Sequence, residues 1–508
     1  MKKAIISVYN KEGIFELAKF LSENNFEIFS TGGTYNYLTS KGLKVKSISE
    51  YTGFPEVLEG RVKTLHPRIF AGILADRNKK EHLEDIEKNK INTFELVVVS
   101  LYPFIETISK AGVEIEEAIE QIDIGGVSLI RAAAKNFSNV SVLVNNSQYD
   151  DYINEFIKTG GKIGLEFNKE LAYKAFKYIA DYDIAISEYF KSLYSEEKTP
   201  DFISLGEYIK LRYGENPHQK GYLIKKDFDK IFEVIHGKEI SYNNILDIDS
   251  AYSIISEFKD SKPVCAIVKH GNPCGVAESD DLFNAYQSAF ATDTISPFGG
   301  IVIFNRKLDF KTSFEVDKLF TEILIAPDFD EDALELLRKK KNRRLIKYKF
   351  CCLDNFELRK VSGGFLYQEK DNVIFDKDKL NVVTEKQPNS EMITDCEFAF
   401  KVVKHTKSNA VVFVKDKKTL GIGGGQPSRI DSTNIAIQKA KQFKLDLKDS
   451  IVASDAFFPF ADSIIELAKV GVKCIIQPGG SVRDKEVIQA ANENNMVMLF
   501  TGIRHFKH

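Results

Sequence analysis

The stretch AIVKHGNPCG, residues 266–275, leads an apolar run directly into a cluster of turn-forming residues. Ala266 to Val268 are predicted to form a buried strand, which the following glycines, asparagine and proline end abruptly. Lys269 and His270 would then lie at the carboxyl end of a strand, where open α/β sheets bind ligands. The neighbouring cation would favour the neutral imidazole of His270, which can accept a proton. The pair indicates a base with an electrophilic partner, but it fits equally a loop lysine and histidine without a chemical role.

Length and charge indicate a multidomain globular protein. A chain of 508 residues is too long for one hydrophobic core and predicts about two to four domains. Its 43% hydrophobic and 28% charged residues are typical of soluble globular proteins. The formal net charge of -3 provides no global field for nucleic acid or anionic membrane. We therefore expect local anion sites that suit small phosphorylated ligands.

The cysteines and apolar runs indicate a cytoplasmic protein. None of the six cysteines stands in a C-x-x-C spacing, which argues against a disulfide framework or a structural zinc site. The first apolar run, Ala4 to Ile6, is too short for a signal peptide, and no run approaches membrane-spanning length. We expect no membrane partner.

One basic run raises the alternative of nucleic-acid binding. Residues 338–349, RKKKNRRLIKYK, follow the acidic stretch Asp328 to Glu335 and contain one aromatic residue, Tyr348. A solvated, charge-balanced surface is the expectation for such a segment, and no nucleic-acid partner is predicted.

The amino-terminal segment predicts a phosphate cradle. The apolar runs 3–8 and 26–29 each lead into a polar turn, SVYNKEG (7–13) or STGGT (30–34), and the first turn precedes apolar residues at helical spacing, Ile14, Leu17, Ala18 and Leu21. Small and hydroxylated residues at a helix start let backbone N–H groups surround an anion. Without a Walker A or G-x-G-x-x-G motif, the glycine pair also fits a simple tight turn. The loop GRVKTLHP (60–67) adds three cationic side-chain types to the region.

Further polar groups follow at the ends of predicted elements. The buried-strand pattern from Glu95 to Leu101 ends at Tyr102, which places a phenol at the same sheet edge. Asp123 precedes a glycine pair that opens a helix, and one face of this helix carries Ser128, Arg131 and Lys135. A basic helix face is commonly only solvated. An acid, a phenol and lysines together at one edge nevertheless indicate a site.

The remainder of the chain suggests a linker and an internal duplication. Residues 191–200, KSLYSEEKTP, are predicted to be a linker. Beyond it, each half gives a strand, a glycine turn, a helix and an Asp followed by Pro-Phe, with SPFGG (296–300) in the first half and SDAFFPF (454–460) in the second. The polar stretch Gln368 to Ser390 would separate the halves.

The motifs together resemble the family of bifunctional purine-biosynthesis enzymes with AICAR formyltransferase and IMP cyclohydrolase activities. The resemblance covers the chain from Ser7 onward and rests on SVYNKEG, STGGT, GRVKTLHP, SLYPF, DIGG, RAAAKN, LRYGENPHQ, KHGNPCG, SPFGG, SDAFFPF and PGGS in the family's order. It implies an α/β fold in which a methylglyoxal-synthase-like domain, residues 1–195, closes the inosine ring of FAICAR to give IMP. Two cytidine-deaminase-like α/β subdomains, approximately 200–370 and 390–508, would form a formyltransferase region, residues 200–508, that transfers a formyl group from 10-formyltetrahydrofolate to AICAR.

The resemblance also implies roles for individual residues. In the cyclohydrolase domain the catalytic set would be Lys63, Tyr102, Asp123 and Lys135, and substrate would be bound by Ser7, Lys11, Ser30, Gly32, Gly33, Thr34, Arg61 and Thr64. In the formyltransferase region Lys269 and His270 would be catalytic, because the poorly nucleophilic amine of AICAR needs a base as it attacks. The nucleotide would be held by Arg212, Tyr213 and Arg504, and the folate by Asn409 and Asp462.

The resemblance implies a homodimer, and the sequence speaks against a catalytic metal. Zinc deaminases need H-x-E and P-C-x-x-C, whereas His270 is followed by Gly and Asn, and Cys274 by Gly, Val and Ala. Two alternatives stay open: a catalytically inactive purine-nucleotide sensor, and an enzyme in which only one domain is active. The presence of Lys269, His270, Lys63, Tyr102 and Asp123 argues against a sensor.

Overall fold

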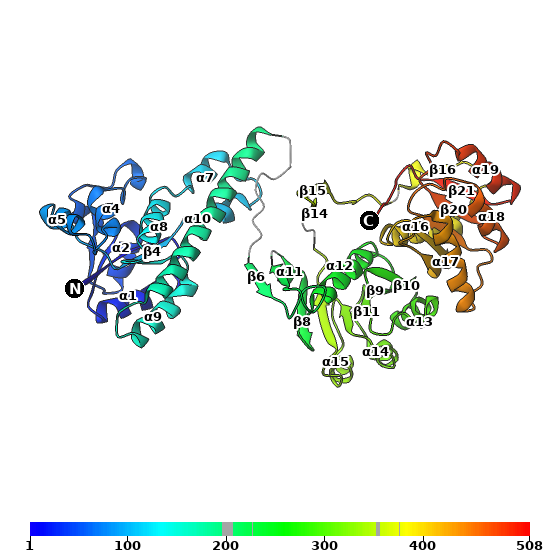
Figure 1. The fold of residues 1–508 in the computed structure, drawn as a ribbon, viewed down its shortest axis with the longest axis horizontal. Coiled ribbons are helices and arrows are strands. Elements are labelled where there is room, and N and C mark those ends of the chain that lie inside the picture. Colours follow the sequence, from blue (N-terminus) through cyan, green and yellow to red (C-terminus); the bar gives the residue numbers. More distant parts are fainter. Residues whose placement is uncertain (196–206, 226, 352–355, 375) are drawn as a thin grey trace. The chain divides into compact units, whose positions relative to one another are not determined.

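The computed structural model describes residues 1–195, 207–225, 227–351, 356–374 and 376–508. The chain divides into two compact units, Met1–Ser204 and Leu205–His508 (Figure 1). The predicted linker is helical at its start, since residues 191–194 form the last turn of α10 (Leu165–Tyr194). The rest of that predicted linker, 196–200, lies outside the described residues.

The first unit is built on a five-stranded parallel sheet. Its strand order is β3-β2-β1-β4-β5, with every neighbouring pair parallel. The strands are β1 (Lys2–Val8), β2 (Phe26–Ser30), β3 (Val45–Ser47), β4 (Leu96–Ser100) and β5 (Ser141–Leu143). The chain builds outward from β1 through β2 to β3 and then crosses to β4 on the other side. The carboxyl ends of β1 and β4 therefore flank the switch point at which such sheets bind ligands.

Helices cover this sheet and bury most of β1, β2, β4 and β5, whereas β3 stays partly exposed. The predicted helix after the first strand is α1 (Ile14–Glu23), which buries Ile14, Leu17, Ala18 and Leu21 as its spacing requires. The other helices are α2 (Gly32–Ser40), α3 (Ile48–Thr52), η1 (Leu58–Gly60), α4 (Pro67–Leu74), α5 (Lys80–Lys88), α6 (Phe104–Ile108), α7 (Ile115–Glu120), α8 (Gly125–Lys135), η2 (Asn146–Gln148) and α9 (Tyr149–Lys158), followed by the 30-residue α10. One continuous apolar core joins the sheet to these helices.

The second unit contains one twelve-stranded sheet made of two topologically equivalent halves. Its order is β16-β21-β20-β19-β17-β18-β10-β9-β11-β12-β13-β8. The first half contains β8 (Phe232–His236), β9 (Val264–Lys269), β10 (Asn272–Glu278), β11 (Ile301–Phe304), β12 (Ile323–Ala326) and β13 (Arg344–Tyr348). The second contains β16 (Asn381–Val382), β17 (Val411–Lys415), β18 (Lys418–Gly423), β19 (Ile451–Ser454), β20 (Cys474–Gln477) and β21 (Val497–Phe500). In each half an antiparallel hairpin is followed by strands with the same pattern of antiparallel and parallel pairing.

The helices repeat in the same order, which confirms the predicted duplication. The helices α12 (Tyr242–Ser256), α13 (Leu282–Thr292), α14 (Phe310–Asp317) and α15 (Glu331–Arg338) correspond to α16 (Ser390–Lys404), α17 (Arg429–Gln442), α18 (Asp462–Lys469) and α19 (Asp484–Glu493). β10 and β18 join the halves as an antiparallel pair. One apolar core includes residues of both α12 and α16, whereas α13 and α17 contribute to separate cores. The halves thus share both a sheet and part of their interior. Outside the repeat lie α11 (Phe228–Ile231), η3 (Lys377–Lys379) and two hairpins, β6 (Glu207–Lys210) with β7 (Tyr222–Lys225) and β14 (Phe356–Val361) with β15 (Gly364–Glu369).

Several details of the predicted repeat were wrong. The segment after Lys269 does not stop the sheet: His270 and Gly271 form a two-residue turn with positive φ, and Asn272 starts the returning strand β10. SPFGG precedes a strand of the first half, whereas SDAFFPF overlaps the end of β19 in the second, so the two motifs do not correspond. The stretch 368–390 also carries β16, which pairs with β21 and thus belongs to the second half.

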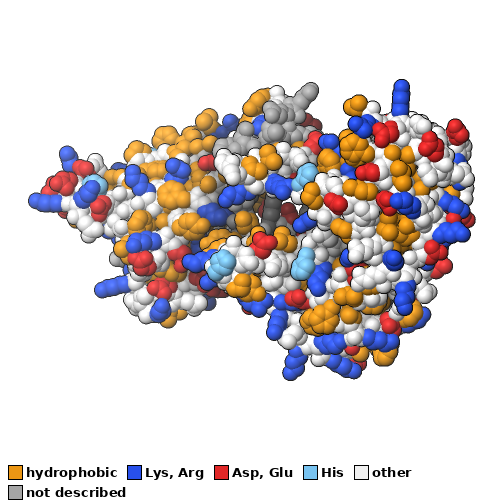
Figure 2. Space-filling model, turned by 45° about the vertical axis from the view of Figure 1, so that its right-hand side comes forward, with side chains coloured by type: hydrophobic (Ala, Val, Ile, Leu, Met, Phe, Trp, Pro, Cys, Tyr) orange, Lys and Arg blue, Asp and Glu red, His pale blue; other side chains and the backbone are white. Residues whose placement is uncertain are grey.

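The basic run 338–349 is only partly solvated, contrary to the prediction. Arg343 and Arg344 are 3% exposed, because they reach inward to Asp317 and Glu322. Positive and negative side chains intermingle on the face of the molecule shown in Figure 2. Within the described part of the chain, no helix is both long and apolar enough to cross a membrane.

Glycines in the second strand of each hairpin allow a helix to pack directly on the sheet. A Cβ on Gly275 would lie 2.0 Å from the carbonyl oxygen of Ala289 in α13, and one on Gly423 would lie 1.9 Å from that of Ser432 in α17. The hydroxyl of Ser432 donates to the carbonyl oxygen of Asn409 at 2.8 Å. This close contact therefore also fixes the position of a predicted site residue.

Gly423→Ala should destabilise the second unit by about 1–3 kcal/mol, because α17 must move away to admit the methyl group. Chemical denaturation of the two proteins side by side measures this difference. Gly364→Ala is the matched control, since a Cβ there meets no atom within 4 Å. Equal stability of the Gly423 variant and the parent protein would contradict the packing argument.

Candidate active sites

A cavity of about 770 Å³ in the first unit lies at the carboxyl ends of β1 and β4. It brings together nine of the predicted residues from five separate segments: Ser7, Lys11, Gly33, Thr34, Arg61, Lys63, Thr64, Tyr102 and Asp123. Ser30 and Gly32 are not among its lining residues. Ser30 is buried, and its hydroxyl donates to the carbonyl oxygen of Ile6 at 2.6 Å, so it joins β2 to β1 beneath the turn.

One end of the cavity has the features of a phosphate site. The helix α2 begins at Gly32, whose φ of 47° favours glycine, and its first turn carries Gly33 and Thr34. The Thr34 hydroxyl accepts from the Val8 amide at 3.1 Å and from Lys11 Nζ at 3.1 Å. Burial, together with the nearby Lys63 ammonium, lowers the pKa of Lys11. A bound anion would relieve this repulsion, and the N–H groups of a helix start suit it.

Lys63, Tyr102 and Asp123 form the polar centre of the cavity. Lys63 Nζ donates to the Tyr102 hydroxyl at 3.0 Å. Burial raises the pKa of Asp123, while the Gly126 amide, 2.6 Å from its carboxylate, and Lys63 act in the opposite direction. An ammonium, a phenol and a buried carboxyl are thus available to stabilise an oxyanion and to move protons.

The two glycines of the motif DIGG shape the cavity, a role that was not predicted from the sequence. A Cβ on Gly125 would lie 2.8 Å from the Thr64 hydroxyl, and one on Gly126 would lie 2.6 Å from the Asp123 carboxylate. Both glycines line the cavity. The absence of side chains at both positions lets Asp123 fold back over the start of α8. The signal in the sequence was the glycine pair that begins two residues after the aspartate.

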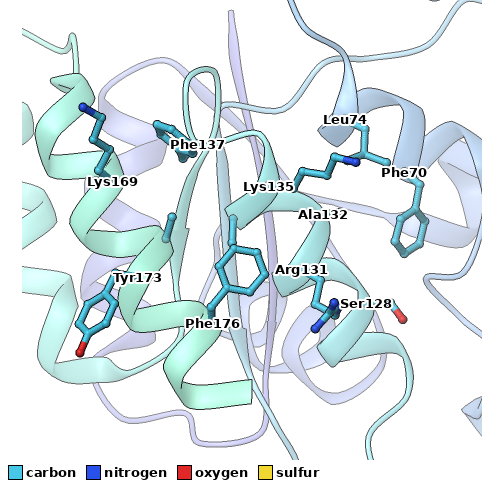
Figure 3. Close-up of a pocket in the computed structure, with 12 residues that line it drawn as sticks. Phe70, Leu74, Ser128, Arg131, Ala132, Lys135, Phe137, Lys169, Tyr173 and Phe176 are labelled. Atoms are coloured by element: carbon cyan, nitrogen blue, oxygen red, sulfur yellow. The ribbon is translucent and has the colours of Figure 1, made fainter. Parts of the chain in front are cut away.

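Lys135 lies away from this cavity. It ends α8, whose first residue, Gly125, lines the cavity, and a helix rises about 1.5 Å per residue. Lys135 instead lines a separate groove between α4, α8 and α10, and Figure 3 shows it with the other lining residues, among them Arg131, Phe70 and Phe176. The guanidinium of Arg131 lies 6.0 Å from the centre of the Phe176 ring. The structure of a single chain does not bring Lys135 into the cavity. Its catalytic role stays a prediction.

In the second unit the turn between β9 and β10 presents Lys269 and His270. Lys269 Nζ donates to the carbonyl oxygen of Phe298, in SPFGG, at 2.7 Å. The Gly271 amide donates to the Asp247 carboxylate of α12 at 2.7 Å, and this hydrogen bond ties the turn to the helix. Burial raises the pKa of Asp247, and the Gly271 amide and the charge of His270 lower it in part. Asp247 is a neighbour of the Lys-His turn that the sequence did not single out, since nothing in its helix pattern distinguishes it.

Arg212 and Tyr213 lie near a buried arginine of the first half of the sheet. This arginine, Arg344, pairs with Glu322 at 2.9 Å. Glu322 in turn accepts from Asn244 of α12 at 3.2 Å and influences Asp247. The distant motifs LRYGENPHQ and KHGNPCG are thereby connected through α12.

The second half of the sheet supplies Asn409 beside the Lys-His turn. The Lys407 amide, two residues before Asn409, donates to the Asn272 side chain at 3.3 Å. The side-chain oxygen of Asn409 accepts from Arg429 at 3.1 Å. Asp462 begins α18, and Arg504 lies exposed in the C-terminal segment with its guanidinium 4.5 Å from the centre of the Phe506 ring. Among the described residues, no group of three or more His, Cys, Asp or Glu side chains is placed to hold a metal ion.

Two units, each with a cluster of polar groups on an α/β scaffold, are the arrangement expected of an enzyme with two active sites. A family model described as AICARFT/IMPCHase bienzyme matches residues 133–439, and one described as MGS-like domain matches residues 13–128. The chain is 51% identical to the bifunctional purine biosynthesis protein PurH of Aquifex aeolicus, with all of both chains covered. It is 50% identical to PurH of Caldicellulosiruptor saccharolyticus, again with full coverage, and 48% identical to PurH of Chlorobaculum parvum, covering 99% of that protein.

The chain belongs to the AICARFT/IMPCHase bienzyme family. The matches confirm the predicted fold class, with a methylglyoxal-synthase-like amino-terminal domain followed by a formyltransferase region. The predicted bifunctional enzyme of purine biosynthesis is confirmed, and neither the sensor nor the enzyme with one active domain finds support.

Proposed function

We propose that residues 1–195 close the ring of FAICAR to give IMP, and that residues 200–508 form FAICAR by transferring a formyl group to AICAR. The observation that carries this assignment is the gathering of nine predicted residues around one cavity of the first unit. The Lys-His turn lies in the other unit. Each set of groups suits one of the two reactions.

Ring closure needs an anchor for the phosphate and a stabiliser for a developing oxyanion. The start of α2, Lys11 and Arg61 hold the phosphate. The carboxamide nitrogen then attacks the formyl carbon, a C–N bond forms, and the formyl oxygen leaves as water. Lys63 and Tyr102, joined by their 3.0 Å hydrogen bond, stabilise negative charge on that oxygen and supply protons to it. Asp123, whose pKa is raised by burial, exchanges protons with the reacting groups.

Formyl transfer needs a base at the AICAR amine. His270 removes the proton as the amine attacks the formyl carbon, and Lys269 stabilises the formyl oxygen. The bond between the formyl carbon and N10 of the folate then breaks, and N10 takes up a proton as tetrahydrofolate leaves. The Lys269 ammonium has three N–H donors, so its bond to Phe298 leaves others available. A folate-type formyl donor follows from the formyltransferase activity. We assign 10-formyltetrahydrofolate as that donor, with Asn409 and Asp462 near it and Arg212, Tyr213 and Arg504 around the nucleotide.

The assembly and compartment belong to the same proposal. The chain acts as a homodimer in the cytoplasm, with its formyl-transfer sites at the subunit interface. Among the described residues, Cys265, Cys274, Cys396 and Cys474 are free thiols, which suits a reducing compartment.

An assay of the purified protein with AICAR and 10-formyltetrahydrofolate tests the whole proposal. Folate turnover reports formyl transfer, and the appearance of IMP reports ring closure. Supplying FAICAR directly separates the second reaction from the first. Failure of either product to form would remove that activity from the chain.

A fragment ending near Ser195 should convert FAICAR to IMP without the second unit. The fragment contains the complete cavity and the apolar core of the first unit. Its circular dichroism shows whether it folds, and IMP formation is then measured directly. A folded fragment that makes no IMP would contradict the assignment of residues 1–195.

A further inference from the structure

We propose that two tyrosines of α10, Tyr178 and Tyr182, are positioning residues for ring closure, because their phenols hold the two loops that carry Tyr102 and Asp123. This inference rests on the proposed function of the first unit. Tyr102 follows β4, whereas Asp123 lies between α7 and α8. The two groups are therefore carried by different loops, and their relative position depends on what joins those loops.

Tyr182 holds the Asp123 loop through two hydrogen bonds. Its hydroxyl accepts from the Asp123 amide at 2.8 Å and donates to the Gln121 carbonyl oxygen at 2.8 Å. A single phenol thus binds the backbone on both sides of Ile122. Since the loop is only four residues long between α7 and α8, this fixes the backbone of Asp123 itself.

The same helix reaches the Tyr102 loop. The Tyr178 hydroxyl accepts from the Leu101 amide at 3.3 Å, directly before Tyr102. The Tyr182 ring also packs edge-on against the buried Phe104, with centroids 6.1 Å apart, just after Tyr102. Residues four apart share one face of a helix about 6 Å apart along its axis. The helix backbone therefore sets the spacing between the two loops.

Both phenols are suited to this role because they stay protonated. Burial raises the pKa of Tyr178, and it raises that of Tyr182 to about 12. A protonated Tyr182 can donate to Gln121 while it accepts from Asp123. Neither tyrosine is among the residues that line the cavity, so each acts through the loops and not on the substrate.

Tyr182→Phe is the sharpest test, because phenylalanine keeps the ring against Phe104 and removes only the hydroxyl. We expect kcat for ring closure to fall about ten- to hundredfold, since displacements near 1 Å can have effects of this size. KM for FAICAR should change less than threefold, because the phosphate groups lie on other elements. Formyl transfer by the same protein should be unchanged. Tyr178→Phe, which loses one weaker bond, should show the same pattern with a smaller fall.

Amide hydrogen exchange supplies a readout that does not depend on activity. The Asp123 amide should exchange faster in Tyr182→Phe, and the Leu101 amide in Tyr178→Phe. The matched control is Tyr189→Phe on the same helix: its ring packs against Phe104 at 5.6 Å, and no partner of its hydroxyl is found among the described residues. That variant should leave kcat and both amides unchanged.

The outcomes separate the positioning role from the proposed function. If kcat in Tyr182→Phe stays within twofold of the parent protein, or falls only as far as in Tyr189→Phe, the positioning role is overturned. If the parent protein itself closes no ring, the proposed function fails. Unchanged exchange at Asp123 and Leu101 would overturn the loop contacts in either case.

Discussion

Lys63→Ala should slow the conversion of FAICAR to IMP by about a hundred- to a thousandfold, as expected for loss of an oxyanion donor. The ammonium contacts the Tyr102 hydroxyl and bears electrostatically on both Lys11 and Asp123, so it acts at the centre of the cavity. Its loss removes charge stabilisation in the transition state and leaves Tyr102 without its partner. Steady-state assays with FAICAR measure the change in kcat.

Formyl transfer provides the internal control for this variant, because Lys269 and His270 lie in the other unit. Lys80→Ala serves as a matched surface control, since its side chain is 87% exposed and pairs with Glu84 one helical turn away. A loss of both activities in Lys63→Ala would indicate misfolding or coupling between the units. Full ring closure by the variant would remove Lys63 from the mechanism.

His270→Ala should lower formyl transfer by about a hundred- to ten-thousandfold, the range that general base catalysis contributes. AICAR should still bind, because Arg212, Tyr213 and Arg504 are unchanged. Isothermal titration with AICAR measures binding, and folate turnover measures the reaction. Ring closure from added FAICAR should continue at the parent rate. Strong formyl transfer by His270→Ala would show that another group is the base.

Mixing variants tests whether a formyl-transfer site is shared between subunits. Arg504→Ala should raise the apparent KM for AICAR, since its exposed guanidinium is the proposed nucleotide contact. If Arg504 and His270 meet across an interface, co-refolding Arg504→Ala with His270→Ala restores one intact site in some heterodimers. Recovered activity would support the shared site. No recovery in heterodimers that are shown to form would mean that each site is built within one chain.

Local sequence patterns predicted the elements of this protein well, because each depends on neighbouring residues. Three such predictions agree with the structure: the strand that contains Val268, the helix from Ile14 to Leu21, and the turn at STGGT before a helix. The motifs of the first unit also named most of the lining of its cavity. Conformational preferences and burial periodicity act over a few residues, so they can be read directly.

Such local patterns could not predict how distant segments of the chain pair. Nothing near His270 distinguishes a strand that stops from one that reverses into a hairpin, and the latter became evident only from the pairing of β9 with β10. Arg343 and Arg344 belong to a charged run for which the sequence predicts exposure. Both are buried, because each pairs with a carboxylate, Asp317 or Glu322. The contacts of Asp247 and Tyr182 likewise join loops to helices far away in the chain.

The sequence alone thus predicted the α/β class and the two activities, and it named candidate chemical groups for both sites. Which of those groups meet was decided by the tertiary structure. It placed Lys63, Tyr102 and Asp123 together at one sheet edge, and it left Lys135 at the far end of α8. The reason is physical: side-chain chemistry belongs to each residue, whereas proximity arises when strand order and helix packing bring remote segments to the same place.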